Sequence, residues 1–162
     1  MPRKSPKASE FEEMRDAKEN IKDFTNEYGM DTSFIAPCGM NCSICMAYLR
    51  EKNKCSGCRG ADVNKAVTRA KCKIKNCLIF QTSEAKYCFE CEQFPCDNLK
   101  HLDKRYRIKY NMSMVENLEN IRNFGIRKFL GTEKKKWTCS ECGCTICVHK
   151  GYCYSCGKKK QP

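Results

Sequence analysis

The sequence predicts a small, irregular, metal-stabilised α+β protein: a cysteine-rich module of several knuckles, helices, and a C-terminal zinc ribbon. The 162-residue chain contains 16 cysteines, a density that requires disulfides, metal ions or redox chemistry. The cysteines gather in two modules, at residues 31–97 and 137–162. The intervening residues 98–136 carry apolar side chains spaced three or four apart, which predicts helices. We therefore expect a chain organised by two metal-binding modules and the helices beside them.

Metal explains the cysteines better than disulfides do. Residues 1–14 are charged and do not resemble a secretory signal, and no run approaches the ~18 apolar residues of a membrane span. We therefore expect a cytoplasmic protein without a membrane segment, where disulfides are rare. Residues 38–96 contain ten cysteines but few large apolar side chains. A structural zinc ion can supply roughly 10 kcal/mol of folding free energy to such a segment.

The first 30 residues form a separate N-terminal unit in this prediction. Residues 1–8 are rich in proline and lysine and are expected to be disordered. Ser9 and Glu12 have the spacing of a capping box, and the apolar periodicity that follows predicts an amphipathic helix over residues 10–28.

Three further helices are expected after the first cysteines. One short helix is predicted around residues 62–70, inside the cysteine-rich module. A second covers residues 98–110, and a third begins at Ser113 and is bent or ended by Gly125. The charged run at residues 133–136 is predicted to be a linker.

The C-terminal module carries the strongest motif. Two C-x2-C knuckles are separated by ten residues, and their four sulfurs suit the tetrahedral coordination of zinc; they are Cys139, Cys142, Cys153 and Cys156. Gly143 and Gly157 follow the knuckles, where we expect glycine to relieve crowding. The pattern is that of a zinc ribbon or a rubredoxin-like knuckle pair.

Three more donors lie between these knuckles. Cys144 and Cys147 are interpreted as small core residues, and His149 as a surface or capping residue. The alternative is a second ion, although three donors rarely complete a structural zinc site. Trp137 and Tyr152 are expected to pack over the zinc loops rather than to stack on bases.

The N-terminal module offers ten metal-ligand candidates: Cys38, Cys42, Cys45, Cys55, Cys58, Cys72, Cys77, Cys88, Cys91 and Cys96. Grouping by knuckles predicts two quartets, one from the cysteines at 42, 45, 55 and 58 and one from those at 72, 77, 88 and 91. Cys38 and Cys96 would then meet each other. An interleaved grouping is the alternative. Two or three zinc ions are expected in the whole chain, or one [4Fe–4S] cluster in residues 38–96.

The motifs CGMNCSIC, CSGC, CKIKNC and CFECEQFPC, all within residues 38–96, closely resemble the cysteine-rich family called domain of unknown function 3795. The resemblance covers residues 38–99. It implies a metal-binding module, and the zinc-ribbon extension resembles one that some members of this family carry. The spacing Cys38-x3-Cys42-x2-Cys45 also occurs in radical S-adenosylmethionine enzymes. Those enzymes need a large (β/α) barrel, for which this chain has neither the length nor the repeat.

The sequence favours a non-catalytic protein. It contains two histidines and no phosphate loop, dinucleotide fingerprint or zinc-protease motif, and no small-molecule substrate can be identified. A thiol outside the metal sites could be reactive; Cys38, Cys96, Cys144 and Cys147 are the candidates.

The formal charge of +12 would be about halved by three zinc ions, each held by four thiolates. The basic character that remains is compatible with RNA. Residues 104–110 are the most basic aromatic segment, and possible nucleic-acid contacts there are Lys104, Arg105, Arg107 and Lys109. Its tyrosines either stack on unpaired bases or belong to the core. The lysines at 158–160 would add to such a surface or keep the chain soluble.

Two functions follow from these patterns. In the first, the protein is a zinc-binding adaptor or binding module for RNA, a ribonucleoprotein or a protein partner. In the second, residues 38–96 hold an iron–sulfur cluster that serves electron transfer or redox sensing in an anaerobe.

Overall fold

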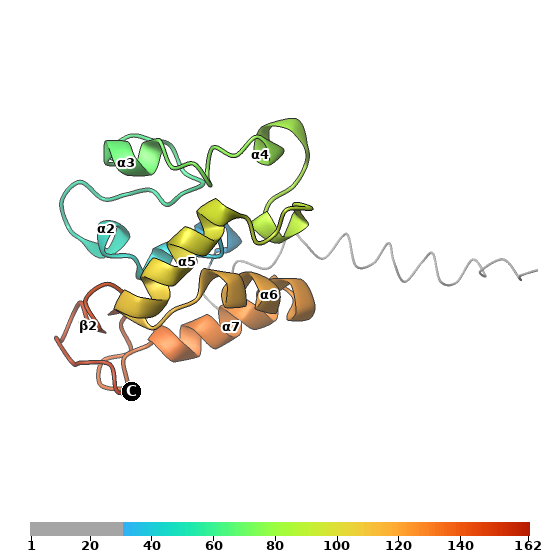
Figure 1. Ribbon diagram of the computed structural model, residues 1–162. Coiled ribbons are helices and arrows are strands. Elements are labelled where there is room, and N and C mark those ends of the chain that lie inside the picture. Colours follow the sequence, from blue (N-terminus) through green and yellow to red (C-terminus); the bar gives the residue numbers. More distant parts are fainter. Residues whose placement is uncertain (1–30) are drawn as a thin grey trace, which may run out of the picture.

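The computed structural model describes residues 31–162, which form a mixed helical structure with one two-stranded sheet (Figure 1). The predicted capping box at Ser9 and the helix over residues 10–28 lie outside the described residues. None of the helices within residues 31–162 is long and apolar enough to span a bilayer.

The cysteine-rich module consists mainly of loops joined by single helical turns. Because its sequence offers few apolar residues at helical spacing, no long helix forms there. Its elements are η1 (Thr32–Phe34), η2 (Cys42–Ile44), α2 (Met46–Leu49), α3 (Val67–Ala70), α4 (Ile79–Thr82) and η3 (Cys88–Glu90). The helix predicted around residues 62–70 is therefore shortened to its last four residues.

Three longer helices lie together beside this module (Figure 1). They are α5 (Asp97–Tyr110), α6 (Met114–Phe124) and α7 (Ile126–Trp137). Ser113 caps α6 by accepting a hydrogen bond from the Glu116 N–H at 3.0 Å. Gly125 has φ of +83° and separates α6 from α7. The sequence predictions for α5, for the start of α6 and for Gly125 are confirmed.

The predicted linker at residues 133–136 is wrong, because these residues form the last turns of α7. Phe129, Leu130, Glu133 and Trp137 recur at helical spacing and are all buried. The three lysines between Glu133 and Trp137 suggested a linker, but they occupy the exposed side of a continuous amphipathic helix.

The main core joins the cysteine-rich module to the helices. Leu99, Met114 and Leu118 are fully buried and pack with the buried cysteines. Gly39 has φ of +84°, and a Cβ added there would lie 2.9 Å from both the Leu118 Cγ and the Met114 carbonyl oxygen. Glycine therefore allows the loop that starts at Cys38 to approach the backbone of α6 closely.

The C-terminal residues form a small hairpin after α7. Strands β1 (Ile146–Cys147) and β2 (Tyr152–Cys153) are antiparallel, and Ile146 pairs with Cys153. Trp137, at the end of α7, is 4% exposed and belongs to the same core cluster as Cys139 and Ile146. The expected packing of Trp137 is confirmed, whereas Tyr152 remains 36% exposed.

Candidate metal centre

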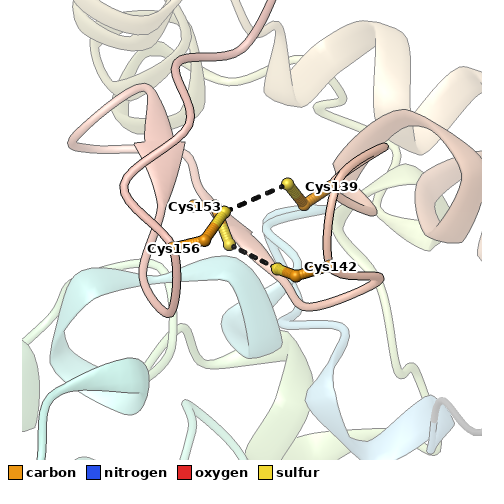
Figure 2. A group of neighbouring side chains, drawn as sticks. All are labelled: Cys139, Cys142, Cys153 and Cys156. Carbon is orange, nitrogen blue, oxygen red and sulfur yellow. Dashed lines mark hydrogen bonds between the residues drawn. The ribbon is translucent and has the colours of Figure 1, made fainter.

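Four cysteine sulfurs converge at the hairpin (Figure 2). The Sγ atoms of Cys139, Cys142, Cys153 and Cys156 all lie within 4.8 Å of one another. The Cys139–Cys156 distance is 3.6 Å and the Cys142–Cys153 distance is 3.5 Å. Sulfurs about 2.3 Å from a tetrahedral zinc ion are about 3.8 Å apart, so the donor set fits one metal ion. Within residues 31–162, this is the only group of three or more cysteine, histidine or carboxylate ligand atoms that close together.

The two knuckles have the same backbone geometry. The Cys139 N–H donates to the Cys144 carbonyl, and the Gly143 N–H donates back to the Cys139 carbonyl. Cys153 repeats both bonds at the same spacing, with Lys158 and Gly157 as partners. This repetition explains how two segments ten residues apart present their sulfurs in equivalent positions.

The glycines are required for a reason other than the one predicted. Gly143 and Gly157 have φ of +70° and +76°, and a Cβ at either position would meet no atom within 4 Å. Crowding is therefore absent. The knuckle turn instead needs a left-handed backbone conformation, which residues other than glycine adopt only with strain.

Backbone N–H groups prepare two of the sulfurs for metal binding. The N–H groups of Cys142 and Glu141 hold the pKa of the Cys139 thiol below its usual value. The Cys156 N–H, followed by that of Ser155, lowers the pKa of Cys153 to about 7. Since the thiolate is the form that binds metal, this hydrogen bonding favours the ligating state. Cys139 and Cys153 are buried, whereas Cys142 and Cys156 face solvent.

The three extra donors of this module do not join the quartet. Cys144 is exposed and Cys147 is completely buried, so the core interpretation is confirmed for Cys147 and wrong for Cys144. His149 is half-buried, and its Nδ1 accepts a hydrogen bond from the Met46 N–H at 3.3 Å. Because Met46 is the first residue of α2, the capping interpretation of His149 is confirmed.

His149 also connects the hairpin to α5. Its Nε2 lies 2.9 Å from the Tyr106 hydroxyl. With Nδ1 acting as acceptor, the neutral ring carries its proton on Nε2 and donates to Tyr106. Burial, with Arg69 and Arg105 nearby, lowers the pKa of His149 and favours this neutral form. The Val148 N–H donates to the Ile44 carbonyl, so the hairpin is docked on the cysteine-rich module by adjacent residues.

The ten cysteines of residues 38–96 are arranged differently. All are free thiols, and neither predicted quartet brings three sulfurs within 4.8 Å of one another. One contact lies within the first predicted quartet, and another crosses the predicted groups. The Cys58 N–H donates to the Cys42 Sγ at 3.4 Å, and the Cys88 N–H donates to the Pro37 carbonyl at 2.9 Å. Cys88 is thereby held next to Cys38.

The electrostatic neighbours of these thiols give the same arrangement. Burial raises the pKa of Cys38, and the nearby Cys58, Cys88 and Cys72 raise it further. Burial raises the pKa of Cys88 to about 12, and the thiols of Cys96, Cys77, Cys91 and Cys72 contribute to the rise. Cys88 therefore lies between two groups of sulfurs, and Cys38 lies within one of them.

Sequence reasoning missed the residues that support the loop starting at Cys38. Asn117 of α6 donates to the Gly39 carbonyl at 3.0 Å. Asn41 donates to Glu133 of α7 at 3.3 Å, and its Oδ1 accepts from the Ser43 N–H. Glu133 lies 92 residues from Asn41 in the sequence, so no local sequence pattern predicts this contact. The helical spacing of Glu133 from Phe129 and Trp137 was the one available signal.

The basic segment at residues 104–110 lies on α5. Lys104, Arg105, Arg107 and Lys109 are all exposed. Arg107 pairs with the buried Asp103 at 3.7 Å. Tyr106 and Tyr110 are half-buried and pack against His149. Of the two interpretations of these tyrosines, the structure favours core packing over base stacking.

The fold and the sulfur quartet define a cysteine-rich protein with a potential metal-binding centre. Residues 34–101 match the family described as "Protein of unknown function (DUF3795)". The resemblance inferred from the four motifs is thus confirmed for that segment, which ends before the hairpin begins. Comparisons with curated proteins and with solved structures give no significant match.

Proposed function

We propose that this protein is a non-catalytic zinc-binding module that presents a basic surface to RNA. The observation that carries the zinc assignment is the sulfur quartet, whose four donors lie within 4.8 Å of one another on two equivalent knuckles. Zinc accepts four thiolates in a tetrahedron and imposes no redox chemistry on them. Thiols kept for metal binding also suit the reducing cytoplasm, where we expect the protein to work.

The cysteine-rich module is proposed to hold further zinc in interleaved sites. The bond that holds Cys88 beside Cys38 crosses the knuckle-based grouping, whereas the hydrogen bond from the Cys58 N–H to the Cys42 sulfur lies within the first quartet. We therefore favour one site that includes Cys38, Cys42 and Cys58. A second site would draw on Cys77, Cys91 and Cys96, with Cys72 and Cys88 completing the two sets.

The proposed role is binding rather than catalysis. The two histidines of the chain are His101, which is exposed on α5, and His149, whose two ring nitrogens are engaged by Met46 and Tyr106. RNA is the proposed partner because the chain remains basic even when zinc–thiolate centres are counted.

Anaerobic purification followed by elemental analysis and absorption spectroscopy tests the zinc assignment. We expect colourless protein with two or three zinc ions per chain. A brown sample with iron and sulfide would establish the alternative, an iron–sulfur protein for electron transfer or redox sensing. That alternative is favoured only by the abundance of free thiols in residues 38–96.

A further inference from the structure

Two adjoining surface hollows run along the junction between α7 and the hairpin. They share Thr138, Cys139 and Ser140 and have volumes of about 460 Å³ and 270 Å³. Lys134 and Lys135 line the larger hollow. Lys136 lines the smaller one together with the C-terminal lysines, Lys158, Lys159 and Lys160. Figure 1 shows the C-terminus beside this end of α7, so two segments separated in sequence bring their lysines to one place.

These lysines are largely without acidic partners. Among the described residues, Lys158 alone of the six has a carboxylate within 4 Å, which belongs to Glu141. Lys136 and Lys160 lie over the ring of Trp137, at 5.6 Å and 5.0 Å. A cation in the last turn of a helix is favoured by the helix dipole, which accounts for the lysines of α7. It does not account for the three that come from the C-terminal segment.

The zinc–thiolate centre next to the hollows carries two negative charges when four thiolates hold Zn²⁺. Six lysines exceed this charge even after Glu133 and Glu141 are counted. Ser140 places an exposed hydroxyl between the lysines, whereas the hydroxyl of the exposed Thr138 donates to the Lys134 carbonyl at 2.6 Å. Hydroxyls and lysines are both common partners of phosphate oxygens.

Aromatic side chains are exposed on β2 and directly after it. Tyr152 and Tyr154 are 36% and 39% exposed. The backbone of Tyr152 pairs with that of Lys159 in an isolated antiparallel β-bridge. Cationic grooves beside exposed aromatic rings are typical of surfaces that bind single-stranded nucleic acid, because the rings stack on unpaired bases. By contrast, the tyrosines of α5 are packed against His149.

We propose that single-stranded RNA binds along these hollows, with its phosphates between the lysines of α7 and those of the C-terminal segment. The inference rests on the proposed RNA-binding function but places the contact away from α5. It assigns the electrostatic contacts to Lys136, Lys159 and Lys160, and base stacking to Tyr152 and Tyr154.

The test is binding of a labelled single-stranded RNA of mixed sequence to the zinc-loaded full chain, measured by fluorescence anisotropy over a range of salt concentrations. The hollow variant is Lys136→Gln/Lys159→Gln/Lys160→Gln. The matched variant on α5, Lys104→Gln/Arg105→Gln/Lys109→Gln, removes the same charge. We expect the hollow variant to lose at least about tenfold in affinity and about 2 from the salt slope, since each phosphate contact to a single strand contributes about 0.7. The α5 variant should change the affinity less than about threefold.

Zinc content and melting temperature show whether the variants are folded. A second variant, Lys135→Glu/Lys159→Glu, changes only exposed lysines and should also weaken binding. Equal losses in the hollow and α5 variants, or a larger loss in the α5 variant, would overturn the placement and leave the proposed function intact. If the wild-type chain shows no salt-dependent RNA binding, the proposed partner is wrong, and this inference fails with it.

Discussion

The two cysteine modules use the same kind of residue in different ways. In the hairpin, two identical turns bring four sulfurs within 4.8 Å of one another, and the centre is partly open to solvent. In residues 38–96 the sulfurs lie in loops that are packed into the core, with Cys38, Cys42 and Cys88 buried among apolar side chains. The comparison shows that a repeated local turn can bring four sulfurs together by itself, whereas the placement of sulfurs in distant loops depends on the helices around them.

The largest expected effect is the loss of a metal ligand from the hairpin. Cys153→Ser removes a buried sulfur of the quartet, so we expect the protein to lose one zinc ion and the ordered hairpin with it. Structural zinc contributes on the order of 10 kcal/mol to such a fold. Elemental analysis and the amide NMR spectrum measure both consequences.

Cys144→Ser is the matched control for this substitution. Cys144 lies in the same module but is exposed and outside the quartet, so its replacement should leave the zinc content unchanged. Equal zinc content in the Cys153 variant and the wild type would contradict the assignment of the quartet.

The next largest effect is expected from a comparison of one glycine in each module. Gly39→Ala places a Cβ 2.9 Å from α6 atoms at a φ of +84°, so clash and backbone strain together should cost about 2–4 kcal/mol. Gly143→Ala meets no atom and suffers only the strain, about 1 kcal/mol. Denaturant unfolding of the zinc-loaded protein measures both values. If the two alanine variants were equally stable, the dependence of the Cys38 loop on α6 would be refuted.

A smaller effect concerns the contact between the modules. Tyr106→Phe leaves the His149 Nε2–H without its partner and should cost about 1 kcal/mol.

The same histidine makes stability depend on pH. The pKa of His149 is lower in the folded protein than its value of about 6.5 in the unfolded chain. The stability that the neutral ring contributes is therefore present above that pH and is lost as the pH falls through the folded pKa. His149→Phe should remove this pH dependence. If the stability of the His149→Phe variant still fell at acid pH as it does in the wild type, this pH dependence could not be assigned to His149.

The smallest expected effect lies at Glu133, which joins the Cys38 loop to α7. Burial raises the pKa of Glu133, so the folded protein retains this proton to a higher pH than the unfolded chain does. Stability attributable to this group therefore falls as the pH rises from about 4.3 to the folded pKa. Glu133→Gln keeps an acceptor for Asn41 and should flatten that decline, with a change of about 1 kcal/mol or less at pH 7.

Glu119→Gln is the control for this last prediction, because it removes the same charge from an exposed position on α6. Its stability should follow the wild-type pH dependence. If Glu133→Gln instead made the decline steeper, folding would have to lower the pKa of Glu133 rather than raise it.

The hairpin and the N-terminal cysteine module also differ in how much of their structure could be predicted from the sequence. The hairpin quartet is predictable because its geometry depends on two short turns, and the spacing of four cysteines contains that information. Residues 98–125 were also predictable, since Leu99, Leu118 and Gly125 belong to simple helical patterns. The partition of the ten N-terminal thiols depends on contacts between distant loops, such as the bond from the Cys88 N–H to the Pro37 carbonyl that holds Cys88 next to Cys38, which no local spacing specifies.

The error at residues 133–136 has a physical cause of its own. A run of lysines carries no apolar signal, yet the helix continues through it because Glu133 and Trp137 are buried on one side. The docking of His149 on Met46 and Tyr106 likewise joins residues 43 or more positions apart. Contacts of this kind become visible only when the helices are placed in three dimensions.

The central claim is that the cysteines hold zinc in sites of four sulfur ligands. Zinc X-ray absorption spectroscopy of the anaerobically purified full chain tests it most directly. The account predicts an all-sulfur shell at about 2.3 Å, with four sulfurs for each zinc ion. A shell containing oxygen or nitrogen at about 2.0–2.1 Å, or the absence of bound zinc, would contradict it.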